Sequence, residues 1–161
     1  MVEEAAVRAA VEAVDADEVL RSAKALVAAS SENPGGDERA AAAVAGEILS
    51  ATAAAAETLE SEPGRVNVIA RIGSGRPKLA WNGHLDVVPA GDPGGWPHPP
   101  FDAVVTGGRL WGRGAADMKG AVAAALAAGA AIGRAGVELG GTLEFHLVAD
   151  EEHSGDRKSV V

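Results

Sequence analysis

The sequence predicts an α/β domain in which helices cover a mixed β-sheet. Apolar residues recur with helical spacing in two Ala-rich regions, 15–56 and 118–134. Between and after these regions, short segments rich in Val, Ile, Leu, Phe and Trp are separated by glycine-rich turns, as strands are. The resulting order is helix, helix, hairpin, strand, helix, strand, which is typical of a sheet layered with helices.

The first two helices are predicted from their starts. Asp15 and Glu18 have capping-box spacing, so we expect Asp15 to cap a helix and Glu18 to take its third position. Asn33-Pro34-Gly35-Gly36 then interrupts the helical pattern. A second helix is predicted from Asp37 to about Ala56, because an acidic first turn suits the positive end of a helix dipole.

The remaining elements follow Pro63-Gly64, where the pattern of the chain changes. Val66–Ile72 is predicted as a strand that forms a hairpin with Lys78–Trp81. A loop rich in Pro and Gly, a short strand, a helix of small residues and a final strand come next: Val87–Phe101, Arg109–Trp111, Met118–Arg134 and Thr142–Ala149. We expect the final strand to lie at an exposed apolar edge of the sheet.

The composition excludes several classes of function. The 161 residues are 47% hydrophobic and 23% charged, as in folded globular proteins, and they include no cysteine, which excludes disulfide scaffolds and thiolate metal sites. A net charge of −9 argues against nucleic-acid partners and anionic membranes. The most apolar stretch, Ala121–Ile132, is shorter than the roughly 20 residues of a membrane span. Without a secretory signal, we expect a cytoplasmic protein.

Three short polar clusters follow predicted strands, where ligands gather in open α/β sheets. In the first, His84 and Asp86 are two residues apart, so their side chains point the same way on an extended chain. The carboxylate can then hold one ring N–H and leave the other nitrogen for a metal. The alternative is a histidine whose hydrogen bonds are satisfied near a turn.

The other two clusters are acidic. Asp117 lies between a glycine-rich turn and a helix, where it is either a metal ligand or an ordinary N-cap. Asp150-Glu151-Glu152 follows an apolar strand, and such a run is either a solvated loop or the surroundings of a cation. Together with His84, these carboxylates form an oxygen and nitrogen ligand set that suits Zn, Co or Mn.

The motifs Gly-His-Leu-Asp-Val-Val-Pro, Gly-Arg-Gly-x-x-Asp-Met-Lys-Gly and Asp-Glu-Glu, in this order, closely resemble those of a zinc-dependent amidohydrolase and exopeptidase family. Its members include acetylornithine deacetylase, succinyl-diaminopimelate desuccinylase, aminoacylase and bacterial glutamate carboxypeptidase. The resemblance covers about Val19 to Gly155. It implies a truncated catalytic domain of zinc-exopeptidase type, with a three-layer α/β/α mixed-sheet fold.

The resemblance also implies a role for each matching residue. His84 would bind one of two divalent ions, Zn or else Co or Mn, and Asp86 would orient that histidine. Asp117 would bridge the two ions, and Glu152 would bind the second. Glu151 would act as the general base. The metal ligands are therefore expected to be His84, Asp117 and Glu152, and the other catalytic side chains Asp86 and Glu151.

In this family the peptide bond after the bridging Asp is typically cis, which here means Asp117-Met118. The resemblance implies hydrolysis of amide bonds in N-acyl amino acids or small peptides. The alternatives are an aminopeptidase of the same fold and a binding domain that has lost catalysis. Arg113 and Lys119 flank the motif without an assigned role, and we expect His146 to be structural.

Members of the family are about twice as long as this chain or longer. We expect residues 1–155 to be the N-terminal part of a metallohydrolase catalytic domain, 156–161 to be a non-native tail, and the lid domain to be absent. The whole parent protein would dimerise through that lid domain. This chain alone is expected to be inactive, because further metal ligands lie in the missing part.

Overall fold

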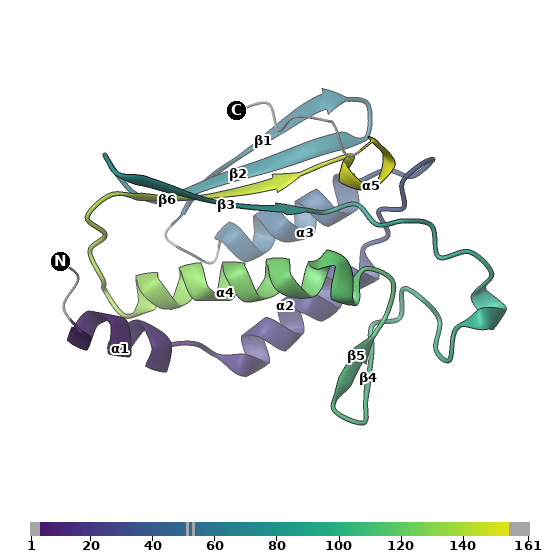
Figure 1. Cartoon of the computed structure of the whole chain (residues 1–161), viewed down its shortest axis with the longest axis horizontal. Helices are drawn as coiled ribbons and strands as arrows, with labels where there is room; N and C mark the ends of the chain where they lie inside the picture. Colours follow the sequence, from purple (N-terminus) through teal and green to yellow (C-terminus); the bar gives the residue numbers. More distant parts are fainter. Residues whose placement is uncertain (1–3, 51, 53, 155–161) are drawn as a thin grey trace.

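The computed structural model describes residues 4–50, 52 and 54–154, so the tail predicted at 156–161 lies outside the described residues (Figure 1). The helices, including a 3₁₀ helix and an irregular turn named η1 and η2, are α1 (Glu4–Glu12), α2 (Ala16–Ala28), α3 (Arg39–Ser50), η1 (Pro93–Gly95), η2 (Ala115–Lys119), α4 (Gly120–Arg134) and α5 (Glu151–Ser154). The strands are β1 (Ala55–Glu62), β2 (Arg65–Gly73), β3 (Lys78–His84), β4 (Val104–Thr106), β5 (Arg109–Trp111) and β6 (Thr142–Val148).

The central sheet is mixed and has the strand order β1-β2-β6-β3. Strand β2 runs antiparallel to both β1 and β6, whereas β3 and β6 run parallel. The predicted α/β class with a mixed sheet is therefore confirmed. Because β3 and β6 are parallel neighbours, their carboxyl ends lie at the same edge of the sheet, and the segments that follow them begin side by side.

The predicted hairpin between Val66–Ile72 and Lys78–Trp81 is wrong. Strand β2 turns back on β1 through Pro63-Gly64, and β3 pairs instead with β6. Strand β6 is consequently an interior strand, so the prediction that Thr142–Ala149 forms an edge is also wrong. The turn residues at 73–75 correctly indicate a change of direction, but local turn chemistry does not specify which distant strand becomes the partner.

The helix predicted to reach Ala56 ends earlier, at Ser50. The Thr52 hydroxyl donates to the Leu49 carbonyl oxygen at 2.7 Å and accepts from the Ala54 amide at 3.1 Å, which satisfies backbone groups at the helix end. Residues Ala55–Glu62 then pair with Arg65–Arg71 of β2. Alanine favours a helix locally, but this pairing with a strand distant in sequence overrides that preference.

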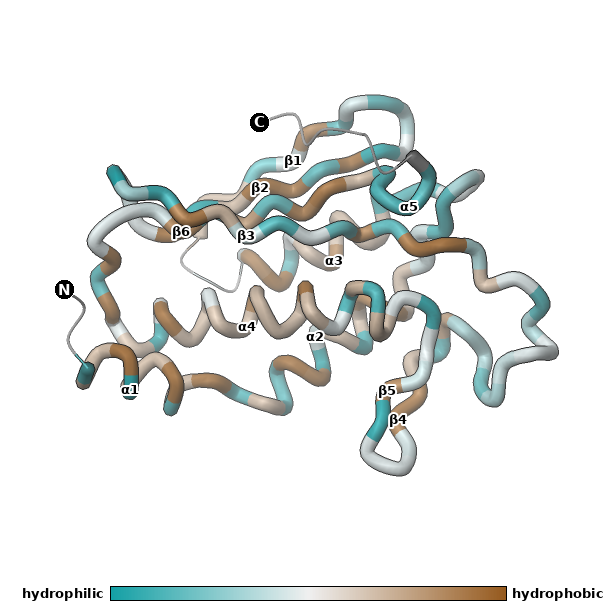
Figure 2. The backbone as a smooth tube through the Cα atoms, in the orientation of Figure 1, coloured by the Kyte–Doolittle hydropathy of each residue, from teal (hydrophilic) through white to brown (hydrophobic). Residues whose placement is uncertain are grey.

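Helices α2, α3 and α4 pack beneath one face of the sheet (Figure 1). The cap predicted for α2 is confirmed, because Asp15 accepts hydrogen bonds from the Asp17 and Glu18 amides. Helix α1 was not predicted; it packs beside the end of α4, where Arg134 donates to the Ala13 carbonyl oxygen. Figure 2 shows hydrophobic and hydrophilic residues alternating along the sheet, while the middle of α4 is uniformly apolar.

Helix α4 owes its small residues to its close approach to the sheet. A Cβ atom at Gly129 would lie 2.8 Å from Cζ of Phe145, so only glycine fits without a shift. By length and composition, Ala115–Arg134 is also long and apolar enough to cross a membrane. Its buried residues, Leu126 among them, join the core beneath the sheet, which accounts for that composition without a membrane.

The opposite face of the sheet carries charge. Glu144 on β6 accepts hydrogen bonds from Arg71 and Lys78 and contacts Nε2 of His146 at 3.2 Å. These contacts outweigh the effect of desolvation and lower the pKa of Glu144 to about 2. His146 thus has a structural partner. In the described part of the chain the long helices lie on the other face, so two of the three expected layers are present.

We expect Leu126→Ala to destabilise the fold by about 2–5 kcal/mol, the usual cost of truncating a fully buried leucine. The Leu126 side chain is 1% exposed and lies in the core between α4 and the sheet. The measurement is urea denaturation followed by circular dichroism. Leu79→Ala is the control, because Leu79 is 68% exposed and its truncation leaves no cavity. Equal destabilisation by both substitutions would contradict the assigned core.

Candidate metal centre

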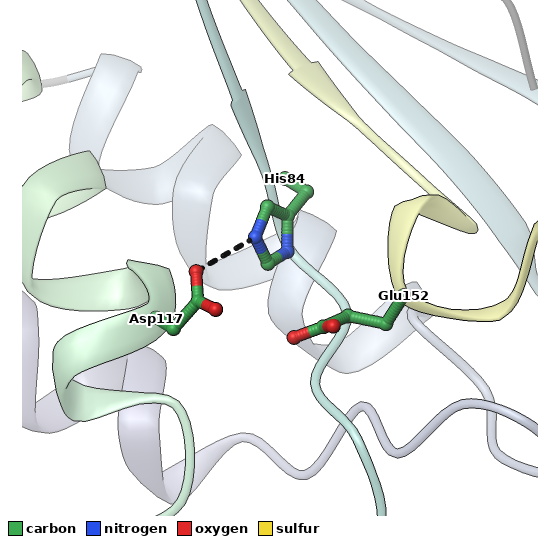
Figure 3. A group of neighbouring side chains, drawn as sticks. All are labelled: His84, Asp117 and Glu152. Carbon is green, nitrogen blue, oxygen red and sulfur yellow. Dashed lines mark hydrogen bonds and ion pairs between the residues drawn. The ribbon is translucent and has the colours of Figure 1, made fainter. Parts of the chain in front are cut away.

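The three polar clusters meet at one edge of the sheet. His84 is the last residue of β3 and pairs in register with Val148 of β6. Glu151 and Glu152 begin α5 directly after β6, and Asp117 lies in η2, just before α4. Figure 3 shows His84, Asp117 and Glu152 pointing toward one another from these three segments. The edge is the carboxyl end of the parallel pair, where ligand sites occur in α/β sheets.

The side chains of His84, Asp117 and Glu152 have the spacing of a metal site. Nε2 of His84 lies 3.2 Å from Oδ1 of Asp117. One ligand atom from each of the three residues lies within 4.8 Å of the other two. Among the described residues, no donor reaches the buried Oε1 of Glu152. One imidazole and two carboxylates, one of which has an orphaned buried oxygen, are a donor set that a divalent cation would satisfy.

The orientation of His84 is fixed from its far side. Nδ1 lies 2.9 Å from the backbone carbonyl oxygen of Asp86 and 3.5 Å from the Oδ1 of that residue. Burial alone would lower the pKa of His84, but hydrogen bonds to Asp86 and the negative charge of Asp86 raise that pKa to about 9, with help from Asp117. The other ring nitrogen, Nε2, is the one directed at Asp117.

Asp86 is completely buried and accepts hydrogen bonds from several sides. Its carboxylate accepts from the Glu151 amide at 3.2 Å, from the Glu152 amide at 2.9 Å and from Nδ2 of Asn33 at 2.8 Å. Burial would raise the pKa of Asp86, but these donors and His84 lower it to about 2. Asp86 therefore stays ionised and ties the histidine to the start of α5.

The two glutamates differ in their surroundings. Burial and the neighbouring carboxylates raise the pKa of Glu152, against the opposing effect of His84. The Glu151 side chain is 51% exposed, and its Oε2 lies 3.8 Å from Nε2 of His84. Glu151 thus stands at the open side of the group, within reach of a molecule that enters from solvent.

Asp117 does not cap the helix that follows it. Helix α4 begins after Lys119, and the Asp117 carboxylate, 68% exposed, is directed at His84. The Asp117-Met118 peptide bond is cis, as the resemblance implies.

Of the two flanking basic residues, Lys119 is fully buried and donates to the Ala29 carbonyl oxygen at 2.7 Å. Burial lowers the pKa of Lys119 to about 8.

Two residues of this region were not predicted from the sequence. From the sequence, Asn33 stands out as part of a chain break and, with Pro34, as a further resemblance to the family without an assigned role, and Arg65 does not stand out. Asn33 is fully buried and donates a hydrogen bond to Asp86, and Arg65, whose side chain is 17% exposed, donates to Asn33. The signal available for Asn33 is the resemblance of Asn33-Pro34 to the family. Arg65 offered no such signal, because an arginine at a strand start is usually solvated.

Metal affinity should depend on pH. A metal binds neutral imidazole, and the pKa of His84 in the metal-free chain is about 9, so binding at neutral pH must release the proton of His84. We expect zinc affinity to rise by about tenfold per pH unit between about pH 6 and pH 8, because proton competition falls as pH rises. The measurement is competition with a chelator across this range. A flat profile would contradict the assignment of His84.

A family model described as Peptidase family M20/M25/M40 matches residues 80–161, half of the chain and all of the candidate centre. The chain belongs to the M20 peptidase family. M20 proteins are metallohydrolases, which agrees with the cluster of potential ligands at the sheet edge.

Relatives within the M20 family include two bacterial proteins named succinyl-diaminopimelate desuccinylase. The one from Methylobacterium radiotolerans is 43% identical over 141 residues, 84% of this chain and 35% of its own length. The one from Xanthobacter autotrophicus is 52% identical over 99 residues, 60% of this chain and 26% of its own length. The chain therefore spans about a third or less of these relatives.

Solved structures agree on the fold. Human carnosine dipeptidase 1 superposes with a TM-score of 0.79 and 26% identity, covering 97% of this chain and 37% of the dipeptidase. An M20 family metallo-carboxypeptidase from Sulfolobus solfataricus gives a TM-score of 0.74 at 24% identity, over 84% of this chain and 31% of that structure. The described fold is thus the corresponding part of an M20 catalytic domain.

Proposed function

We propose that the protein carrying this chain hydrolyses the amide bond of N-acyl amino acids, using two divalent metal ions at the sheet edge. The observation that carries the proposal is the grouping of three potential ligands, His84, Asp117 and Glu152, with Glu151 beside them. His84 and Asp117 would hold one ion, and Asp117 and Glu152 the other. Zinc suits these ligands, as do cobalt and manganese.

Bound divalent ions would supply Lewis acidity toward the amide carbonyl and make water easier to deprotonate. Glu151 accepts the proton of the attacking water and then delivers it to the leaving nitrogen. The exposed Glu151 carboxylate can reach both the attacking water and the leaving nitrogen, because it lies at the open side of the centre. Asp86 does not touch substrate; it holds His84 and the amides of α5 in place.

The substrate class rests on the relatives. The bacterial proteins at 43–52% identity are named for removal of a succinyl group from an amino acid, whereas the human dipeptidase is 26% identical. We therefore infer an N-succinyl or similar N-acyl amino acid as the substrate. Dipeptides are the second candidate, which the superposition of 97% of this chain on 37% of the dipeptidase supports. A role limited to binding is disfavoured, because it gives Glu151 no function beside Glu152.

The test uses a complete M20 chain that carries residues 1–154, loaded with zinc. We expect kcat/KM for N-succinyl-diaminopimelate to exceed that for carnosine by at least about 10²-fold, since sites built for a polar substituent discriminate strongly. The reverse order would favour the dipeptidase alternative. Metal-saturated protein that hydrolyses neither compound, nor any other N-acyl amino acid offered, would contradict the proposal.

The 161-residue chain by itself should be a poor hydrolase. Its described residues offer three ligand side chains at the centre, so each of two ions would have about two protein ligands with Asp117 shared. The measurement is turnover of the same substrates by this chain in excess zinc. A metal-loaded monomer that works at about 1 per second or faster, an ordinary enzymatic rate, would contradict this count of ligands.

A further inference from the structure

A buried chain of polar side chains runs from strand β2 to the metal centre, and it begins at Arg65. The guanidinium of Arg65 donates from Nη1 to Oε1 of Glu38 at 2.6 Å and from Nη2 to Oδ1 of Asn33 at 3.0 Å. Glu38 and Asn33 are both fully buried, and the Arg65 side chain is only 17% exposed. The planar fork of arginine suits two such acceptors at once, which the point charge of lysine does not.

Asn33 connects Arg65 to two buried carboxylates. Its Nδ2 donates to Oδ2 of Asp86 at 2.8 Å and to Oδ1 of Asp150 at 2.9 Å. An amide has one oxygen and one nitrogen end, so the bond from Arg65 to the oxygen end decides that the nitrogen end faces the two carboxylates. With the amide reversed, its oxygen would meet two acceptors inside the protein, which is costly.

Asp86 is the point at which this chain reaches the centre. The same Oδ2 that accepts from Asn33 also accepts from the Glu152 amide at 2.9 Å. Its other oxygen, Oδ1, accepts from the Glu151 amide and lies 3.5 Å from Nδ1 of His84. A displaced Asp86 carboxylate would therefore disturb the histidine and both glutamates together.

We propose that Arg65 is a positioning residue of the metal centre, acting through Asn33 and Asp86 on His84 and α5. The inference rests on the proposed function, since it presumes that a metal binds at His84. Within the described part of the chain, the hydrogen bonds and ion pairs of Arg65 go to Asn33, Gly36, Glu38 and Asp150, and none goes to the three potential ligands. Its effect is to fix the direction of one buried amide.

The test compares zinc affinities of the 161-residue chain and its variants, by competition with a chelator. We expect Arg65→Met to weaken zinc binding by about 10–100-fold, the usual effect of removing a partner that supports a ligand. Arg65→Lys keeps the charge opposite Glu38 but loses the planar fork, so its zinc affinity should also fall well below that of the wild type. Substitution with cobalt should show a changed visible absorption band in both variants.

Arg71→Met is the matched control. Arg71 also lies on β2 and also pairs with a buried glutamate, Glu144, but this pair lies further from the centre, toward the Thr142 end of β6. We expect its zinc affinity to stay within about twofold of the wild type, even where its stability falls like that of Arg65→Met. A merely structural role for Arg65 would move stability in both variants and zinc affinity in neither.

The outcomes separate the two proposals. Wild-type affinity in folded Arg65→Lys would overturn the positioning role, because the charge alone would then suffice. Should Arg65→Met not fold, Arg65→Lys decides the question. Wild-type chain that binds no zinc, or binds it equally well after His84→Ala, would instead overturn the proposed metal centre and the positioning role with it.

Discussion

Replacing Glu151 with Gln in a complete M20 chain that carries these residues is expected to lower kcat by about 10²–10⁴-fold, the range that a general base contributes. The amide occupies nearly the same volume but cannot accept a proton from water. Metal content should not change, because Glu151 is not among the three potential ligands, and its backbone amide, which donates to Asp86, is retained.

The measurement pairs steady-state kinetics with elemental analysis of zinc. Glu47→Gln is the control, because Glu47 is an exposed glutamate on α3, far along the chain from the centre. Loss of zinc from Glu151→Gln would mean that the roles of Glu151 and Glu152 are exchanged. Near-normal kcat with full zinc would remove Glu151 from the mechanism altogether.

His84→Ala should empty the centre, whereas Asp86→Ala should only weaken it. Nε2 of His84 is the one nitrogen among the three potential ligands of the group, and alanine at this position leaves only the carboxylates of Asp117 and Glu152. Asp86 supports His84 from behind through Nδ1, and loss of such a partner typically costs 10–100-fold in affinity or activity. Zinc retained after dialysis, measured for both variants, checks this order.

Asp86 does more than support His84, because its carboxylate also accepts hydrogen bonds from the backbone amides of Glu151 and Glu152. A moderate loss in Asp86→Ala therefore reports on positioning of the whole centre. Complete and equal loss of zinc in both variants would indicate that Asp86 is itself a ligand.

How far the fold follows from local sequence varies along the chain. The cap at Asp15 and the strand at Thr142–Val148 were predicted correctly, because capping geometry and alternation act within a few residues. The hairpin partner of β2 was predicted wrongly, since β1 and β3 are both adjacent in sequence and the choice depends on β6, which lies far along the chain. Alanines near residue 55 favour a helix alone and join a strand only because β2 is available.

The residues of the candidate centre are easier to predict from the sequence than the fold around them. His84, Asp117 and Glu152 belong to short motifs, and the structure brings them together. The hydrogen bonds that support them could not be predicted from the sequence, because Asn33 lies 53 residues from Asp86 and 117 residues from Asp150 along the chain. Contacts at such separations follow from the packed sheet, and no spacing rule in the sequence predicts them.

The most direct test of the metal centre is X-ray diffraction at the zinc absorption edge from crystals of this chain soaked in zinc. We predict an anomalous peak about 2.0–2.1 Å from Nε2 of His84 and within bonding distance of a carboxylate oxygen of Asp117. A second peak that shares Asp117 and lies against Glu152 would match the two-ion arrangement. A zinc-containing crystal with no peak at His84, or with peaks only elsewhere on the chain, would contradict the account.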